Sequence, residues 1–150
     1  MHLDTPVIEY RAEVPDPVAF VRLFATTGWD PQGRLTVAAA VEALGHTWYA
    51  VSAYDDACLV GTGRIVGDGV LHALLVDVIV DPAYRHRGIG SGIIARLVAE
   101  CRARRVLDVQ LFCARYTAYF CERLGFIARP DDAPGMELMV RDAQPEPEVS

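Results

Sequence analysis

The stretch from Val76 to Val98 constrains the fold more than any other part of the chain. A continuous apolar run ends at Asp81-Pro82, and apolar residues recur with helical spacing from Ile93 onward. This pattern predicts a strand, a loop and a helix, in that order. The loop, residues 85–92, reads Arg-His-Arg-Gly-Ile-Gly-Ser-Gly and therefore combines two arginines with three glycines.

The composition of this loop is that of an anion site. Backbone amides at a helix N-terminus attract negative charge, and the arginines add to the positive potential. Glycine at positions 88, 90 and 92 removes Cβ atoms that would keep phosphate oxygens away from the amides, and it permits positive φ angles. Each hydrogen bond to a charged oxygen contributes roughly 1.5–3 kcal/mol, so three or four such bonds could hold a diphosphate.

Two common phosphate motifs do not fit the loop. A Walker A loop ends in Gly-Lys-Ser/Thr, whereas Gly90-Ser91-Gly92 contains no lysine. A dinucleotide fingerprint places its first glycine at the strand end, whereas Gly88 lies well beyond Val80 and position 93 is isoleucine.

The pattern that matches is Arg/Gln-x-x-Gly-x-Gly, with Arg85, Gly88 and Gly90 after a strand that ends in Val-Asp-Pro. It resembles the pyrophosphate-binding motif of the GNAT superfamily of acyl-CoA-dependent N-acetyltransferases. The resemblance continues to Tyr119-Phe-Cys-Glu-Arg-Leu-Gly-Phe126 and covers about half of the chain. The order and spacing look like the bacterial and plastid branch that includes plant serotonin N-acetyltransferases.

Length and composition favour one domain. A chain of 150 residues with 52% hydrophobic content can bury a single core, so we expect one domain over 1–141 and a disordered acidic tail over 142–150. The net charge of −6 argues against a nucleic-acid partner. The sequence has no apolar run long enough for a membrane span and no signal-like N-terminus, which predicts a cytoplasmic protein.

Hydrophobic periodicity predicts an antiparallel meander in the first half and a β-α-β crossover in the second. The resemblance implies an α/β (α+β) fold, with a mixed, mostly antiparallel sheet of six or seven strands and about four helices, splayed at its central parallel pair. The expected strands are 7–13, 47–54, 57–66, 70–80, 106–112 and an edge strand at 135–140. The expected helices begin near Pro17, Arg34, Ile93 and Tyr116.

The resemblance also implies that acetyl-CoA is the acyl donor. The pantetheine arm would follow a strand edge, and the loop would take the diphosphate, mainly through the amides of residues 86–91. The expected cofactor-binding residues are Val78, Ile79, Val80, Arg85, His86, Arg87, Gly88, Ile89, Gly90, Ser91 and Gly92. The thioester would lie where this strand splays from the strand at 109–111.

The catalytic residues depart from the family pattern. A tyrosine usually stands four residues before the glycine of Leu-Gly-Phe and protonates the leaving thiolate, but this chain has Cys121 there. Cys121 could donate that proton, could accept the acetyl group if its pKa were lowered, or could be a packed cysteine without a role. Tyr119 points about 160° away from that direction, so it and Tyr116 could substitute only in a shifted helix.

The identity of the general base is also left open by the sequence. Asp77 is one candidate, but strand alternation puts it on the face opposite His72 unless a bulge intervenes. Asp77 could instead be a structural acid, and a water relay is a further option. Arg64 and Asp68 could contact the acceptor, with surface exposure as the simpler interpretation.

A histidine, the two tryptophans and the four cysteines also bear on the site. His86 is either a solvated loop residue or part of the anion site. Trp29 and Trp48 either fill the core or line the acceptor site. The four cysteines have no metal-like spacing with the histidines and are expected to be free thiols, so no metal is expected.

The sequence therefore predicts an acetyl-CoA-dependent N-acetyltransferase that acts through a ternary complex. A small primary amine, such as an arylalkylamine or polyamine, is the expected acceptor. The alternatives are a protein N-terminal or lysine acetyltransferase and a catalytically weak acetyl-CoA-binding module. A homodimer is a family-level expectation.

Overall fold

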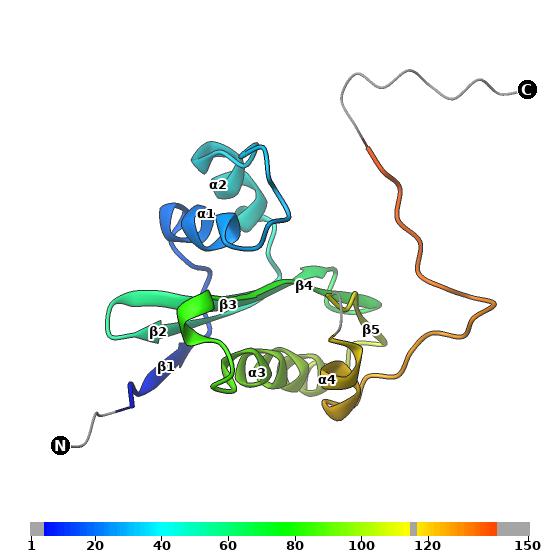
Figure 1. The fold of residues 1–150 in the computed structure, drawn as a ribbon. Helices are drawn as coiled ribbons and strands as arrows, with labels where there is room; N and C mark the ends of the chain where they lie inside the picture. Colours follow the sequence, from blue (N-terminus) through cyan, green and yellow to red (C-terminus); the bar gives the residue numbers. More distant parts are fainter. Residues whose placement is uncertain (1–4, 115–116, 141–150) are drawn as a thin grey trace, which may run out of the picture.

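The computed structural model describes residues 5–114 and 117–140, which form two helical layers around one sheet (Figure 1). The strands are β1 (Ile8–Arg11), β2 (Tyr49–Asp55), β3 (Cys58–Gly67), β4 (His72–Val80) and β5 (Asp108–Leu111). The helices are α1 (Pro17–Ala25), α2 (Val37–Gly45), the 3-10 turn η1 (Pro82–Tyr84), α3 (Ile89–Ala103) and α4 (Ala118–Arg123). The predicted helices and the first five predicted strands are confirmed, with shifted boundaries: α3, for example, begins at Ile89, four residues before its expected start.

The sheet has the order β1-β2-β3-β4-β5. Strands β1 to β4 pair antiparallel with their neighbours, so the predicted meander is confirmed. Strand β5 pairs parallel with β4, from His72 opposite Asp108 to Leu75 opposite Leu111. Helix α3 connects these two strands, as a parallel pair requires.

Each face of the sheet has its own hydrophobic core. Helices α1 and α2 cover one face, and α3 and α4 lie on the other (Figure 1). On the α3 face, buried Ile93 and Leu97 pack against residues of β2, β3 and β4. On the α1 face, Phe20 and Leu44 pack against Leu59 and Ile79. Trp48 is half-buried against the α3-face core, whereas Trp29 is 52% exposed in the loop after α1.

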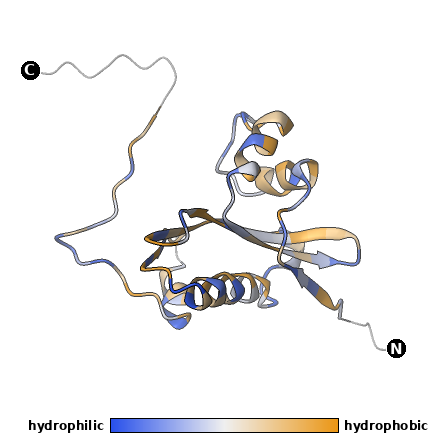
Figure 2. Ribbon diagram, turned by 180° about the vertical axis from the view of Figure 1, so that it is seen from behind, coloured by the Kyte–Doolittle hydropathy of each residue, from blue (hydrophilic) through white to orange (hydrophobic). Residues whose placement is uncertain are grey.

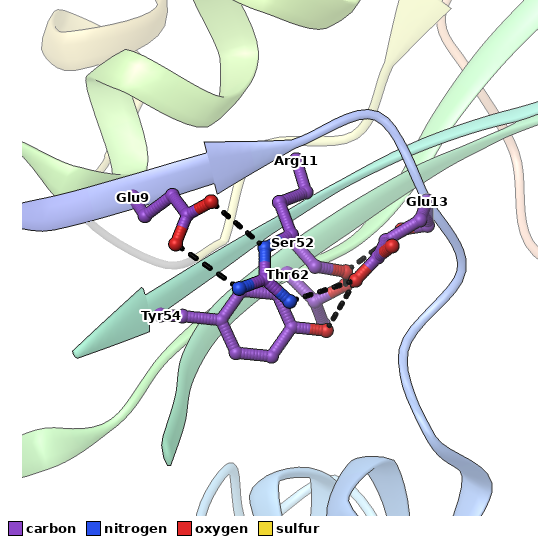
Figure 3. Close-up of polar contacts among 6 residues, drawn as sticks. All are labelled: Glu9, Arg11, Glu13, Ser52, Tyr54 and Thr62. Carbon is purple, nitrogen blue, oxygen red and sulfur yellow. Dashed lines mark hydrogen bonds and ion pairs between the residues drawn. The ribbon is translucent and has the colours of Figure 1, made fainter. Parts of the chain in front are cut away.

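A polar network connects residues 9–13 to strand β2 (Figure 3). Arg11 donates two 3.0 Å hydrogen bonds to Glu9, and its guanidinium lies 4.6 Å from the centre of the Tyr54 ring. The Tyr54 hydroxyl donates to Glu13 Oε1 over 3.0 Å. Buried Ser52 donates from Oγ to the main-chain oxygen of Glu13. These bonds hold the turn from β1 into α1 against β2.

The expected edge strand at 135–140 is wrong. This segment leads away from the sheet in both views (Figure 1, Figure 2) and pairs with no strand among the described residues. Met136, Leu138 and Val140 share the predicted face but are each more than 80% exposed. Apolar residues dominate this segment, but a strand also requires a neighbouring backbone. The sheet therefore has five strands among the described residues instead of six or seven.

No helix among the described residues is long and apolar enough to cross a membrane. The predicted acidic tail lies outside the described residues.

Candidate active site

The end of β4 is turned sharply into the loop by Asp81. Its main-chain amide donates to Val60 O over 2.8 Å, and its Oδ1 accepts from Ala83 N over 2.8 Å. Pro82 begins the 3-10 turn with a φ angle that suits a helical first position. The sequence Val-Asp-Pro thus ends the strand and starts the loop in three residues.

The N-terminus of α3 has the features of an anion site. Gly88 is the N-cap residue with φ of 77°, and no side chain caps the helix. The amide of Gly92 donates to Gly88 O, so the amides of Ile89, Gly90 and Ser91 precede the first intrahelical bond. No acidic residue lies in the first turn. The helix therefore directs unpaired amides and its positive dipole end outward.

The basic residues before the helix surround this N-terminus on its solvent side. Arg85, His86 and Arg87 are exposed, and His86 has φ of 63°, a left-handed backbone. The Arg87 guanidinium lies 5.2 Å from the centre of the Tyr84 ring. The solvated-loop interpretation of His86 agrees with this exposure, and its imidazole still lies in the segment that borders the free amides.

Tyr84 anchors the loop to the β2–β3 hairpin, which the sequence did not indicate. Its hydroxyl donates to Asp55 Oδ2 over 2.5 Å. This hydrogen bond is the main reason that the pKa of the Tyr84 phenol is raised, because the bond favours the protonated form. Residues 29 positions apart are joined here, so no local sequence pattern signals the contact.

The three loop glycines have three different roles. Gly88 supplies the left-handed backbone, and nothing lies within 4 Å of a Cβ built there. A Cβ on Gly90 would lie 3.7 Å from Val80 and 3.9 Å from Phe120, so the space beside it is open. At Gly92, a Cβ would lie 2.5 Å from the Tyr10 hydroxyl. The missing Cβ of Gly92 therefore serves helix–strand packing, in place of the phosphate access expected for it.

The second half of β4 has an unpaired edge. On the β5 side, β4 is paired only as far as Leu75, because β5 ends at Leu111. Residues 76–80 therefore present main-chain groups on that side without a strand partner among the described residues. Val78, Ile79 and Val80, the predicted pantetheine-binding residues, lie within this stretch and lead directly to the loop. Among the described residues, the parallel pair β4–β5 lies at one edge of the sheet and not at its centre as predicted, and β4 extends beyond β5 there.

A β-bulge at Asp77 places its carboxylate on the α1 face. The register with β3 shifts between Thr62 and Arg64, and Asp77 has φ of 54°. Leu75 before the bulge and Val78 after it both pack on the α3 face, which shows that the alternation is interrupted. Asp77 Oδ2 accepts a 2.8 Å hydrogen bond from Arg64 Nε.

Arg64 is mostly buried and anchored by hydrogen bonds, so the surface exposure expected for it is wrong. Its side chain is 15% exposed, and its Nη1 also donates to Ala43 O and Thr47 Oγ1. His72 lies five residues before Asp77, about 16 Å along the strand, and pairs with Asp108 over 3.0 Å. Asp68 accepts three amide hydrogen bonds in the β3–β4 turn, and these lower the pKa of its carboxyl.

Phe120 and Cys121 are adjacent on helix α4, but their side chains lie in different places. Phe120 comes close to Gly90 at the start of α3, whereas Cys121 is 5% exposed and lines a separate cavity. Tyr119 is 73% exposed, with Arg123 stacked 6.0 Å from its ring centre. Tyr116 lies outside the described residues. The proximity of Phe120 to the loop was not predicted, although Phe120 belongs to the Tyr-Phe-Cys-Glu-Arg motif.

The environment of Cys121 favours a protonated thiol. Burial and then a hydrogen bond with the Cys113 thiol raise the pKa of Cys121 to about 11. Of the roles considered from the sequence, nucleophilic attack requires a lowered pKa, so this environment opposes it. Proton donation requires a protonated group at neutral pH, and Cys121 meets that requirement.

The cavity beside Cys121 has a volume of about 470 Å³ and is formed by β5, α4 and the segment after α4. No residue of β4 or of the loop lines it. The structure thus brings the loop, the β4 edge and Phe120 together, and it places Cys121 on the adjoining side of α4. Among the described residues, no three His, Cys, Asp or Glu side chains are grouped to hold a metal ion.

Comparison with known proteins agrees with this geometry. The family model for the acetyltransferase (GNAT) family matches residues 12–126. The chain is 32% identical over 122 residues to serotonin N-acetyltransferase 2, chloroplastic, from Oryza sativa subsp. japonica, a match that covers 81% of this chain and 61% of the relative. It is 32% identical over 77 residues to a chloroplastic GCN5-related N-acetyltransferase from Arabidopsis thaliana, covering 51% of this chain and 39% of that protein.

Solved structures show the same fold. A GNAT-family acetyltransferase from Streptococcus pneumoniae superposes with a TM-score of 0.76 at 25% identity, covering 91% of this chain and all of that one. Glucosamine-6-phosphate N-acetyltransferase from Arabidopsis thaliana superposes with a TM-score of 0.70 at 15% identity, covering 91% of this chain and 99% of that one.

The fold, the uncapped α3 entrance and the match over residues 12–126 define the class: the chain belongs to the acetyltransferase (GNAT) family. Within that family, its sequence relatives include chloroplastic N-acetyltransferases of plants. The matched regions span only about 39–61% of the length of the first two curated relatives.

Proposed function

We propose that the protein transfers the acetyl group of acetyl-CoA to a small primary amine, directly within a ternary complex. The observation that carries this proposal is the continuity of two backbone surfaces: the unpaired edge of residues 76–80 runs into the uncapped N-terminus of α3. One surface suits an extended pantetheine arm, and the other suits a diphosphate.

The residues present fit acetyl-CoA. The left-handed Gly88 and the open space beside Gly90 leave room for phosphate oxygens at the amides of residues 89–91. Arg85 and Arg87 supply positive charge on the exposed side of the loop. When bound, acetyl-CoA supplies the acetyl thioester, and the main-chain groups of Val78 and Val80 orient its arm.

Asp77 is the group that we assign to the acceptor amine. Arg64 holds Oδ2, whereas Oδ1 accepts no hydrogen bond among the described residues. The carboxylate is 22% exposed and belongs to the unpaired half of β4, close to where the thioester would lie. Asp77 would accept a hydrogen bond from the amine and take its proton as the acyl bond forms.

The proton for the departing thiolate is assigned to Cys121. With a pKa of about 11, the thiol keeps its proton at neutral pH and does not compete as a nucleophile. Donation to a thiolate of ordinary basicity is then uphill by about two pKa units, which predicts slower turnover than a better-matched acid would give. This mismatch supports a second candidate function, a catalytically weak acetyl-CoA-binding module.

The acceptor class rests on a relative and on the charge of Asp77. The Oryza relative is named a serotonin N-acetyltransferase, and serotonin is an arylalkylamine. A carboxylate with one free oxygen suits a cationic amine better than a neutral or anionic acceptor.

The test is acetyl-CoA binding by calorimetry, followed by turnover with a panel of arylalkylamines, polyamines and N-terminal peptides. Products should be measured as acetylated amines by mass spectrometry, because exposed Cys58 and Cys113 would react with chromogenic thiol reagents. Binding with turnover of a small amine supports the enzyme. Binding without turnover of any amine supports the weak module, and the absence of binding contradicts both.

Direct transfer has its own control. All 14 basic residues other than histidine are arginines, so the chain has no lysine that acetyl-CoA could modify. Incubation with acetyl-CoA alone should leave the intact mass of the protein unchanged. An acetyl adduct on Cys121 would instead indicate a covalent intermediate.

A further inference from the structure

Two of the four cysteines line one cavity. Cys113 follows β5, and Cys121 lies on α4, and both contribute to the cavity of about 470 Å³. Cys113 is exposed, whereas Cys121 is buried. The other two thiols lie elsewhere: Cys58 starts β3, and Cys101 is buried in the core of the α3 face.

Thr117 Oγ1 donates to Ala114 O over 2.7 Å, and Cys121 N donates to Thr117 O over 3.1 Å. Because Ala114 directly follows Cys113, these two bonds connect the backbone beside Cys113 to the first turn of α4, which carries Cys121. Cys113 and Cys121 lie eight positions apart in the sequence and line the same cavity. The Cys113 thiol also contributes, after burial, to the raised pKa of Cys121.

We propose that Cys113 and Cys121 form an oxidisable thiol pair, which a hydroperoxide converts into a reversible intrachain disulfide. Exposed Cys113 meets the oxidant first, and its sulfur displaces water or alcohol from the hydroperoxide to form a sulfenic acid. The Cys121 sulfur then bonds to that sulfur, and the sulfenic hydroxyl leaves with the Cys121 proton as water. With hydrogen peroxide, two thiols and one peroxide give one disulfide and two waters.

The arrangement has the asymmetry that such a pair requires. An accessible thiol reacts with the oxidant, and a second thiol in contact with it resolves the sulfenic acid before further oxidation. Burial protects Cys121 from the oxidant, and its side chain lines the same cavity as Cys113. Cys58 is exposed but starts β3 away from this cavity, so it provides a matched control for simple accessibility.

The sequence allows a direct experiment, because trypsin separates all four cysteines. Cleavage after arginine puts Cys58 in peptide 35–64, Cys101 in 97–102, Cys113 in 106–115 and Cys121 in 116–123. The full-length protein is treated with one equivalent of hydrogen peroxide, free thiols are alkylated, and the digest is analysed without reduction. We expect a peptide pair joining 106–115 to 116–123, loss of two thiols per chain and full recovery with dithiothreitol.

Variants decide between the pair and general thiol oxidation. Cys58→Ser should leave the linked peptides unchanged, whereas Cys113→Ser and Cys121→Ser should each abolish them. In Cys121→Ser treated with excess hydrogen peroxide, a second peroxide should oxidise the Cys113 sulfenic acid to sulfinic acid, because its resolving thiol is gone. A mixture of isotope-labelled and unlabelled protein should yield only same-chain pairs.

The proposal is overturned if wild-type Cys113 is oxidised to sulfinic acid without a link to Cys121. It is also overturned if the linked pairs join different chains, or if Cys58 accounts for the lost thiols. These readouts are masses of cysteine peptides and do not depend on acetyl transfer, so they remain valid if the proposed function fails.

Discussion

Arg64 donates from Nε to Oδ2 of Asp77 over 2.8 Å and thereby fixes the carboxylate at the bulge of β4. The same guanidinium reaches Ala43 O at the end of α2 and Thr47 Oγ1 just after it. One side chain therefore positions the candidate base and attaches the α1–α2 layer to the sheet.

Substitution of Asp77 by asparagine should lower kcat by about 100-fold to 10,000-fold, the usual contribution of a general base. The Kd for acetyl-CoA should be unchanged, because in the proposed complex main-chain groups, and not this carboxylate, contact the diphosphate and the pantetheine arm. Steady-state kinetics with a reactive amine and calorimetry measure the two quantities. Asp131→Asn, an exposed aspartate after α4, is the matched control and should keep full activity. If Asp77→Asn kept a kcat within threefold of wild type, the assignment of Asp77 as the general base would be contradicted.

Replacing Arg64 with glutamine should destabilise the protein by about 1–3 kcal/mol, less than a fully buried pair because both partners retain some exposure. Urea unfolding measures this loss of free energy. Asp77→Asn should lower the free energy of unfolding by less in the Arg64→Gln background than in the wild-type background. The reason is that the carboxylate has already lost its partner in Arg64→Gln. Additive losses would show that the pair is not coupled.

Alanine at Gly90 and at Gly92 should have opposite effects. Gly90→Ala leaves ordinary contacts to Val80 and Phe120, so stability should change little, whereas the Kd for acetyl-CoA should rise about tenfold or more. Gly92→Ala forces a Cβ into the Tyr10 hydroxyl and should cost about 1–3 kcal/mol of stability. Thermal unfolding and calorimetry on both variants separate the two roles. Equal loss of acetyl-CoA affinity in the two would contradict the assignment.

Loss of the Tyr84 hydroxyl should loosen the loop. Tyr84→Phe removes the hydrogen bond to Asp55 and should weaken acetyl-CoA binding by about 2-fold to 10-fold, with kcat at saturating acetyl-CoA unchanged. Titration calorimetry and saturation kinetics measure these values. Tyr119→Phe is the control, because Tyr119 is an exposed phenol on α4. An unchanged Kd in Tyr84→Phe would show that the loop is held by other contacts.

Cys121 should make stability fall at alkaline pH. The fold raises the pKa of its thiol from an ordinary value of 9.0 to about 11, so the folded state holds the proton more tightly than the unfolded chain between these values. The stabilisation is complete below pH 9 and is lost as the pH rises through about 11, by at most about 2–3 kcal/mol. The free energy of unfolding of wild type minus that of Cys121→Ala, measured across this pH range, should fall by that amount. A pH-independent difference would contradict the raised pKa.

The loop and its flanking strand and helix could be predicted because their signals are local. Pro82 ends β4, glycine spacing marks the entrance of α3, and apolar periodicity marks the buried face of that helix. The same locality explains the error at residues 135–140. Alternation of Met136, Leu138 and Val140 describes a face, but it does not supply the neighbouring strand that the segment lacks among the residues the structure describes.

The parts of the site that the sequence did not reveal depend on tertiary contacts. Whether a bulge occurs at Asp77 is decided by the register of β3 against β4, so strand alternation alone left its face open. Tyr10 reaches Gly92 from a strand far away in the sequence, and Cys113 and Cys121 line one cavity although they lie eight positions apart. In each case the residue types were visible, but their partners were not.

Strand β4 extends five residues, 76–80, beyond its pairing with β5, so in the proposed complex an extended ligand would meet main-chain amides and carbonyls there. Such recognition is insensitive to which side chains occupy the strand, provided that the strand keeps its conformation. Donor preference can therefore persist while neighbouring sequence diverges. Acceptor preference has no such protection, because it depends on individual side chains such as Asp77, which Arg64 ties to the other helical layer.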